Sequence, residues 1–225
     1  MSLKWSAKSR AHLAPRWLNG ELIMTSNAMD GFWQYFQKRE SELAKISTAD
    51  HPVYDELLEK LQSIDSGLWF EFHTEPGRNE LIITADGCTS LFPLVEEVVS
   101  AAPNIPGWTI IPLKPKSGFP KTAHWKNLKI TISDVVFDPL ECEGSDDLGI
   151  RIFVPGIRSE NIEDAHNAIL RAIDHGLGER KFAECLQHTE VKPLPGNVPL
   201  DTYIPITDLE PYIDWRKKKL DSERR

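Results

Sequence analysis

The densest group of side chains that could bind a metal ion is an acidic segment in the second half of the chain. Six carboxylates follow one another there with no intervening basic residue: Asp134, Asp138, Glu141, Glu143, Asp146 and Asp147. Oxygen ligands of this kind suit Ca²⁺ and Mg²⁺. Their spacing lacks the D-x-[DN]-x-[DN]-G order of a calcium-binding loop, and a hydrated acidic hairpin loop is the simpler account. These residues are cation-site candidates, and we expect no cofactor.

Aromatic and imidazole side chains give three candidates for contact with a partner. Trp69 lies on the face of a predicted strand opposite Phe70, and His124 and Trp125 are adjacent in a lysine-rich loop. Aromatic rings interleaved with cations can stack on bases or dock another protein. Packing in the core or at a hinge is the alternative role for these tryptophans. The chain has 34 acidic and 26 basic residues and a net charge of −8, which argues against nucleic acid as the partner.

No motif typical of an enzyme active site is present. The chain lacks the glycine-rich phosphate-binding patterns, the G-x-S-x-G pattern of many hydrolases and any histidine pair spaced to share a helical face. Cys142 lies among carboxylates, which disfavour a thiolate, and Cys88 has no identifiable base. His166 falls on an apolar stripe, where a hydrogen-bonded boundary histidine is the simpler interpretation. We therefore predict no catalytic residue.

Cysteine usage and hydropathy indicate the compartment. The three cysteines are far apart, odd in number and without a C-x-x-C pair, unlike a secreted disulfide framework. No apolar run reaches the about 20 residues that span a bilayer. The sequence therefore predicts a cytoplasmic protein that makes no membrane contact.

Regular elements are predicted throughout the first half. Ser26 or Asn27 is the expected N-cap of a helix whose apolar residues recur from Met29 to Ile46, and a second helix covers 52–64. Period-two alternation and turn residues then predict a hairpin made of strands 68–73 and 80–85. A helix is predicted over 89–102 and a further strand over 108–113.

Residues 114–126 are the most loop-like internal stretch and the predicted boundary between two halves. In the strand that follows, the apolar phase reverses near Ser133 and Asp134, which predicts a β-bulge. The run from Arg216 to Lys219 is expected to complement the C-terminal dipole of a last helix over 208–220. The other elements expected here are a strand over 148–154, helices over 159–175 and 179–186, and a strand over 188–192.

This order predicts an α+β fold. Strands neighbour their hairpin partners and helices arrive in groups, so mainly antiparallel sheets with helices packed on one side fit best. The β-β-α rhythm recurs in the two halves without a residue-level repeat. We expect a single α+β domain over 29–225, with halves at 29–115 and 126–225.

Residues 1–28 are predicted to be an N-terminal extension, either disordered or upstream of the native start. The codons for Gly20-Glu21 can contain a purine-rich ribosome-binding stretch just before Met24. Met24 or Met29 is therefore expected as the native start in place of Met1.

Several short motifs resemble a family of uncharacterised bacterial proteins annotated only as a domain of unknown function. Phe32-Trp33-Gln34-Tyr35-Phe36 is similar to the F-W-x-x-F helix with which its members begin, and Leu91-Phe92-Pro93-Leu94-Val95-Glu96 is similar to a central motif. Further similar segments are Ala101-Ala102-Pro103, Gly107-Trp108, 177–179, 191–195 and 209–215. The resemblance covers residues 29–215 and implies one cytoplasmic α+β unit. It assigns no active residue, because these are packing motifs.

The function predicted from these observations is that of a soluble, non-catalytic protein-binding or regulatory module. In an immunity-like form, its acidic loop would cover a basic partner protein. The alternative is an enzyme, of the hydrolase class, whose site is assembled from residues distant in sequence. Nothing in the sequence indicates the oligomeric state.

Overall fold

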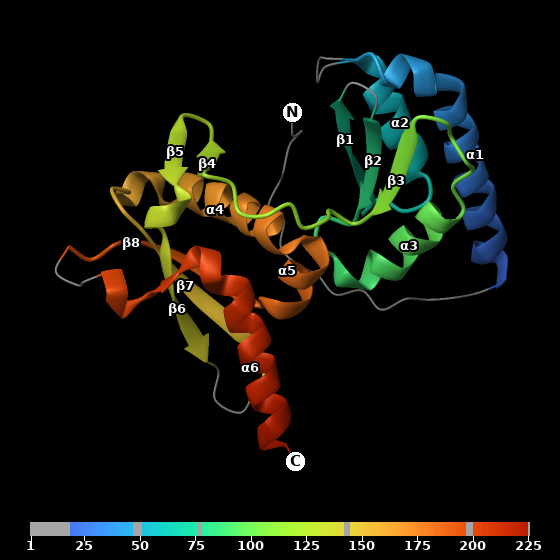
Figure 1. Cartoon of the computed structure of the whole chain (residues 1–225). Coiled ribbons are helices and arrows are strands. Elements are labelled where there is room, and N and C mark those ends of the chain that lie inside the picture. Colours follow the sequence, from blue (N-terminus) through green and yellow to red (C-terminus); the bar gives the residue numbers. More distant parts are fainter. Residues whose placement is uncertain (1–18, 47–50, 76–77, 142–144, 197–199, 225) are drawn as a thin grey trace. The chain divides into compact units, whose positions relative to one another are not determined.

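The structure is a computed structural model that describes residues 19–46, 51–75, 78–141, 145–196 and 200–224 (Figure 1). It has the predicted α+β fold, with small, mostly antiparallel sheets. The chain divides into two compact units between Lys114 and Pro115, at the beginning of the predicted boundary loop.

Unit 1 is built on a three-stranded sheet in the order β1-β2-β3. β1 pairs antiparallel with β2, whereas β3 pairs parallel to β2, and a parallel neighbour needs a crossover that α3 provides. Its elements are α1 (Asn19–Leu43), α2 (Pro52–Gln62), β1 (Trp69–Glu75), β2 (Arg78–Thr84), α3 (Phe92–Ser100) and β3 (Trp108–Pro112).

An aromatic cluster holds unit 1 together. Phe36 on α1 lies edge-on to Trp108 of β3, with ring centroids 4.9 Å apart, and stacks on Phe72 of β1 at 6.4 Å. Trp33 donates a hydrogen bond from its indole Nε1 to the Val98 carbonyl of α3 at 3.0 Å. Phe36 is fully buried, which is worth about 1.5–3 kcal/mol for a large apolar side chain.

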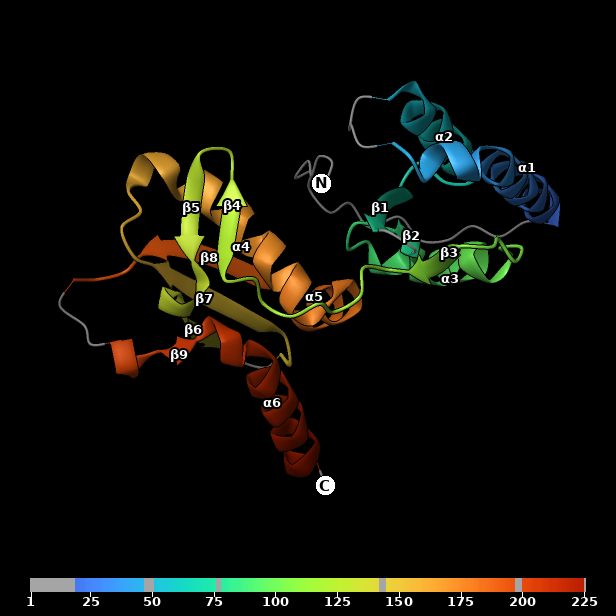
Figure 2. The same cartoon turned by 45° about the horizontal axis from the view of Figure 1, so that its top comes forward.

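Unit 2 combines a four-stranded sheet, in the order β8-β7-β6-β9, with a separate β4–β5 hairpin. α4 lies against both β4 and β8 and therefore runs between the hairpin and the sheet (Figures 1 and 2). The elements are β4 (Thr122–Trp125), β5 (Leu128–Thr131), β6 (Val136–Glu141), β7 (Leu148–Val154), α4 (Ile162–Leu177), α5 (Glu179–Cys185), β8 (His188–Pro193), β9 (Ile204–Pro205) and α6 (Leu209–Glu223).

The core of unit 2 gathers side chains from one face of the sheet and from two helices. α6 contributes two buried residues to this core, Leu209 and Ile213, and Tyr212 packs against it partly buried. The part of α6 after Ile213 therefore depends on contacts outside the core. The core residues from β6, β7 and α4 include Phe137, Ile150, Ile152, Val154, Ile169 and Ile173.

The two units share a connectivity. In each, a hairpin is followed by a helical crossover into a strand that pairs parallel to the second strand of the hairpin: β1-β2-α3-β3 in unit 1 and β6-β7-α4-β8 in unit 2, where α5 follows α4. The recurring β-β-α rhythm of the sequence is therefore a recurring topology.

Three local predictions were wrong. Ser26 and Asn27 lie inside α1, which already includes Asn19. Residues 122–125 form β4 of a hairpin that turns at Lys126, where φ is +49°, instead of belonging to a loop. The phase reversal near Ser133 arises from a 3-10 turn, Ile132–Asp134, which carries the chain from the hairpin to the other sheet.

Two glycines should respond in opposite ways to the same substitution. In Gly176→Ala, the new Cβ would lie 2.6 Å from the partly buried ring of Phe119, so the free energy of unfolding should fall by about 1–3 kcal/mol. Gly31→Ala in α1 meets no atom within 4 Å and should raise that free energy by up to about 1 kcal/mol, because alanine favours helix. Urea titration followed by circular dichroism measures both changes, and a neutral Gly176→Ala would contradict the packing described.

Candidate functional site

The acidic segment is divided among several local environments. Asp134 accepts a hydrogen bond from Ser133 Oγ at 3.1 Å, and Asp138 lies across from Arg151 on the neighbouring strand. Glu143 and the side chain of Glu141 lie outside the described residues. Within the described ranges, no three His, Cys, Asp or Glu side chains come together as metal ligands, so the cation site stays a prediction.

The last two residues of the segment, Asp146 and Asp147, contact the C-terminal helix of the same chain. The Arg216 guanidinium donates to the carbonyl oxygens of Asp146 at 2.7 Å and Asp147 at 3.2 Å. Arg224 forms an ion pair with the Asp146 carboxylate. The prediction that Arg216–Lys219 complements a helix C-terminus was wrong, because α6 continues to Glu223 and Arg216 reaches the acidic loop instead.

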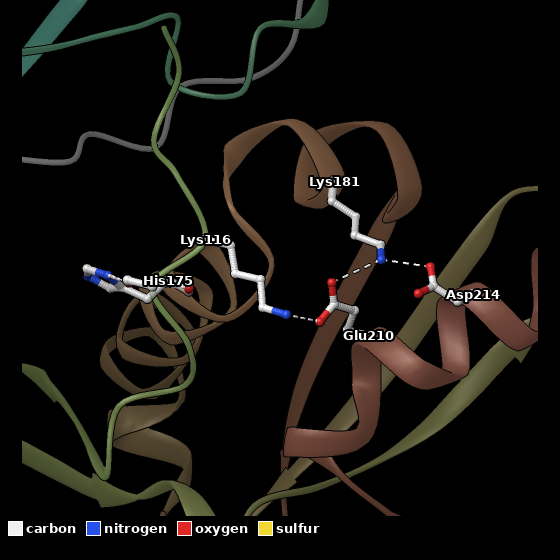
Figure 3. Close-up of polar contacts among 6 residues, drawn as sticks. Lys116, His175, Lys181, Glu210 and Asp214 are labelled. Carbon is white, nitrogen blue, oxygen red and sulfur yellow. Dashed lines mark hydrogen bonds and ion pairs between the residues drawn. The ribbon is translucent and has the colours of Figure 1, made fainter. Parts of the chain in front are cut away.

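An ion cluster fixes the beginning of α6 against the rest of unit 2 (Figure 3). Lys181 of α5 contacts Glu210 at 3.1 Å and Asp214 at 2.7 Å, both on α6. Lys116, from the segment before β4, forms an ion pair with the other oxygen of Glu210. Each exposed pair contributes about 0–1 kcal/mol, so the cluster sets the position of α6 more than the stability of unit 2.

The pKa values in this cluster reflect the same contacts. The hydrogen bond from Lys116 lowers the pKa of the Glu210 carboxyl, partial desolvation opposes this effect, and Lys181 adds to it. Burial disfavours the charged form of Lys181, but the hydrogen bonds to Asp214 and Glu210 outweigh it and raise the pKa of Lys181. Both groups are therefore held in their charged forms at neutral pH.

A serine and a histidine meet beside this cluster (Figure 3). Ser117 Oγ lies 3.1 Å from His175 Nδ1, and the Ser117 backbone N–H donates to the His175 carbonyl at 2.9 Å. In nucleophilic catalysis, a serine hydroxyl is hydrogen-bonded to an imidazole that acts as its base. A third group, usually a carboxylate, must also orient the imidazole. No carboxylate contacts His175 among the described residues. The contacts thus attach the chain before β4 to the last turn of α4.

α6 carries a row of aromatic rings that leads from the core to solvent. Tyr212 lies edge-on to buried Phe137, with centroids 5.6 Å apart, and its other side contacts Trp215, also at 5.6 Å. Trp215 is 55% exposed. The Lys219 ammonium lies 5.5 Å from the Trp215 ring centroid. Tyr212, Trp215 and Lys219 are called the aromatic row below.

The partner-binding candidates from the sequence lie in different environments. Trp69 on β1 is 42% exposed. Trp125 is partly buried against the core of unit 2, and Arg171 lies over its ring at 5.8 Å, whereas His124 is exposed. Because successive strand residues point to opposite faces, His124 and Trp125 cannot form one joint surface.

Sequence reasoning missed Trp215. The apolar stripe of α6 runs through Leu209, Tyr212 and Ile213, and Trp215 falls outside it. One signal is present in the sequence: a tryptophan off the apolar stripe is followed at once by Arg216, and tryptophan and arginine are enriched at binding hot spots.

No family model, curated protein or solved structure matches this chain. The resemblance to an uncharacterised bacterial family therefore stays a prediction. Among the described residues, no helix is long and apolar enough to cross a membrane.

Lys116→Met should raise the pKa of Glu210. Because the folded-state pKa is lowered, ionised Glu210 adds stability above its unfolded-state pKa, and that stability is lost as pH falls through the folded-state pKa. Without Lys116 this contribution should be smaller, and its loss on acidification should be complete at a higher pH. Carbon-13 NMR of the side-chain carboxyl measures the midpoint, with Lys121→Met as the control. An unchanged Glu210 midpoint in Lys116→Met would contradict the cluster.

Proposed function

We propose that this chain is a protein-binding module whose partner docks on the aromatic row of α6. The observation that carries the proposal is the 55% exposure of Trp215 on a helix whose first turns are fixed in the core. Of the large hydrophobic side chains that the structure describes, Trp215 and Trp69 are the two that are exposed. Tryptophan is enriched among the few residues that supply most of the binding energy of an interface.

The surroundings of Trp215 favour binding because they restrict its motion in advance. Tyr212 contacts its ring from one side, and Phe137 supports Tyr212 from the core. A side chain that is already ordered loses little conformational entropy when a partner covers it. The indole therefore offers a large apolar area at a small entropic cost.

The charges around Trp215 favour an acidic partner. Lys218 and Lys219 follow it by three and four residues and lie on the same side of α6, whereas Lys217 lies on the opposite side; all three are exposed. Lys217 and Lys218 have no carboxylate within ion-pair distance among the described residues, and Lys219 has only Glu223 at 4.0 Å. A protein surface with an apolar pocket rimmed by Asp or Glu complements this arrangement.

This proposal changes the partner expected from the sequence. The acidic loop was expected to cover a basic protein, but Asp146 is engaged by Arg224 and, through its carbonyl, by Arg216. The basic face of α6 is the better candidate for the contact surface. If the docked protein is inhibited by the contact, the chain acts as a regulatory or immunity-like module.

Trp215→Ala should abolish most binding to acidic peptides. We would select peptides from a random display library on the whole chain, expecting Asp- and Glu-rich sequences with one apolar anchor. Their affinity for Trp215→Ala should fall by about 30-fold, the loss of roughly 2 kcal/mol typical of a binding hot spot. Fluorescence polarisation with labelled peptides measures this change.

Trp69→Ala is the matched control, because it removes the other exposed tryptophan and should leave the peptide affinity unchanged. Selected peptides without acidic bias, or equal losses for both variants, would contradict the proposal. Tight, Trp215-dependent binding of a single-stranded oligonucleotide would favour nucleic acid instead. Turnover in a general hydrolase screen would favour the enzyme alternative.

A further inference from the structure

The outer edge of β1 is a second candidate surface, in unit 1 and separate from α6. β1 pairs with β2 through seven consecutive residue pairs, from Trp69 opposite Thr84 to Glu75 opposite Arg78, without a bulge. On its other side β1 has no neighbouring strand among the described residues. Backbone N–H and C=O groups along such an edge can pair with another strand.

The sequence of β1 leaves this edge unprotected. Natural edge strands are kept from pairing by charged side chains, lysine above all, and by proline, bulges or short length. Other edge strands of the chain have such features: Pro112 ends β3, Lys192 and Pro193 end β8, and Pro205 ends the two-residue β9. β1 reads Trp-Phe-Glu-Phe-His-Thr-Glu over seven residues. It has no lysine, proline or bulge, and its acidic residues, Glu71 and Glu75, can be paired by a strand that offers a basic group.

The side chains of β1 show which occupant fits. Phe70 and Phe72 pack toward Tyr54 of α2, so Trp69, Glu71 and His73 point to the opposite face. Trp69 and His73 are exposed and Glu71 is half-buried. His73 already lies close to one carboxylate of its own chain, with its Nδ1 3.5 Å from Glu80 Oε2 on β2. A basic group opposite Glu71 and a further acidic group on the open side of His73 would complement this face, and β1 itself carries both in the required order.

We propose that β1 pairs antiparallel with β1 of a second copy of this chain, about a two-fold axis that passes midway between the Phe72 residues of the two copies. An axis perpendicular to the sheet keeps each face continuous, so paired residues must share a face and the axis must lie midway between two copies of the same residue. Centred on Phe72, the pairing places Glu71 opposite His73 of the second copy, twice. Centred on Glu71 it opposes two glutamates, and centred on His73 it opposes two histidines and sets Glu71 against Glu75. Centred on Thr74 it also sets His73 against a glutamate, Glu75, but it pairs only the last three residues of β1. The three strands of each copy then form one continuous sheet across the pair.

A charge exchange tests this register. The whole chain should show a reversible monomer–dimer equilibrium in sedimentation experiments over about 1–200 μM. Glu71→Lys should weaken the dimer about tenfold, since each copy then places a cation opposite His73. Adding His73→Glu should tighten the dimer relative to Glu71→Lys alone, because the introduced lysine of each copy then faces the introduced glutamate of the other. Recovery should fall short of the wild-type dissociation constant, because the new glutamate also lies opposite Glu80 of its own chain.

Two further variants keep the outcome interpretable. Glu71→Gln removes the charge without reversing it and should have a smaller effect, and tryptophan emission verifies that each variant is folded. Trp215→Ala should leave dimerisation unchanged, so failure of this pairing and failure of the α6 proposal are distinguishable. A wild-type monomer at about 200 μM, or a dimer insensitive to both charge changes, would overturn the inference, as would pairing of β1 with a selected foreign peptide.

Discussion

Burial of Leu209 and Ile213 in the core of unit 2 is the constraint on which the α6 surface depends. These two side chains fix the rotation of the helix, and the rotation decides that Tyr212 contacts Phe137 while Trp215 faces solvent. Polar contacts then define the direction of the helix, from the ion cluster at its beginning to Arg216 and Arg224 on the acidic loop. The buried residues and the surrounding ion pairs together hold α6 in one orientation.

The two exposed tryptophans belong to different kinds of surface. Trp215 is backed by Tyr212 and followed by lysines, which suits a side-chain contact with an acidic partner. Trp69 lies on a strand with an open edge, where backbone hydrogen bonds would supply the affinity and side chains the register. Each surface lies within its own unit, so neither depends on residues of the other.

Local patterns in the sequence predicted most of the elements because their causes are local. The spacing of Phe32, Trp33 and Phe36 predicts a buried helical face, and all three residues are buried. The alternation in 68–73 and 80–85 predicts the β1–β2 hairpin, and the structure has it. The α+β class follows from the order of these elements.

The remaining features arise from contacts between residues far apart in sequence, which no local pattern encodes. Lys116 and Glu210 are 94 residues apart, and nothing near either residue indicates the other. Trp215 was missed for a related reason. Its exposure depends on which side of α6 is buried against the core of unit 2, and that is a tertiary contact.

NMR mapping of an acidic peptide selected on the whole chain tests the central claim most directly. During the titration, the indole N–H signal of Trp215 and the backbone amides of Tyr212 and Lys219 should shift first and together. The Trp125 indole, which is packed against the core of unit 2, should remain unchanged. Shifts that spare Trp215, or that centre on the β4–β5 hairpin, would contradict the assignment of α6 as the binding surface.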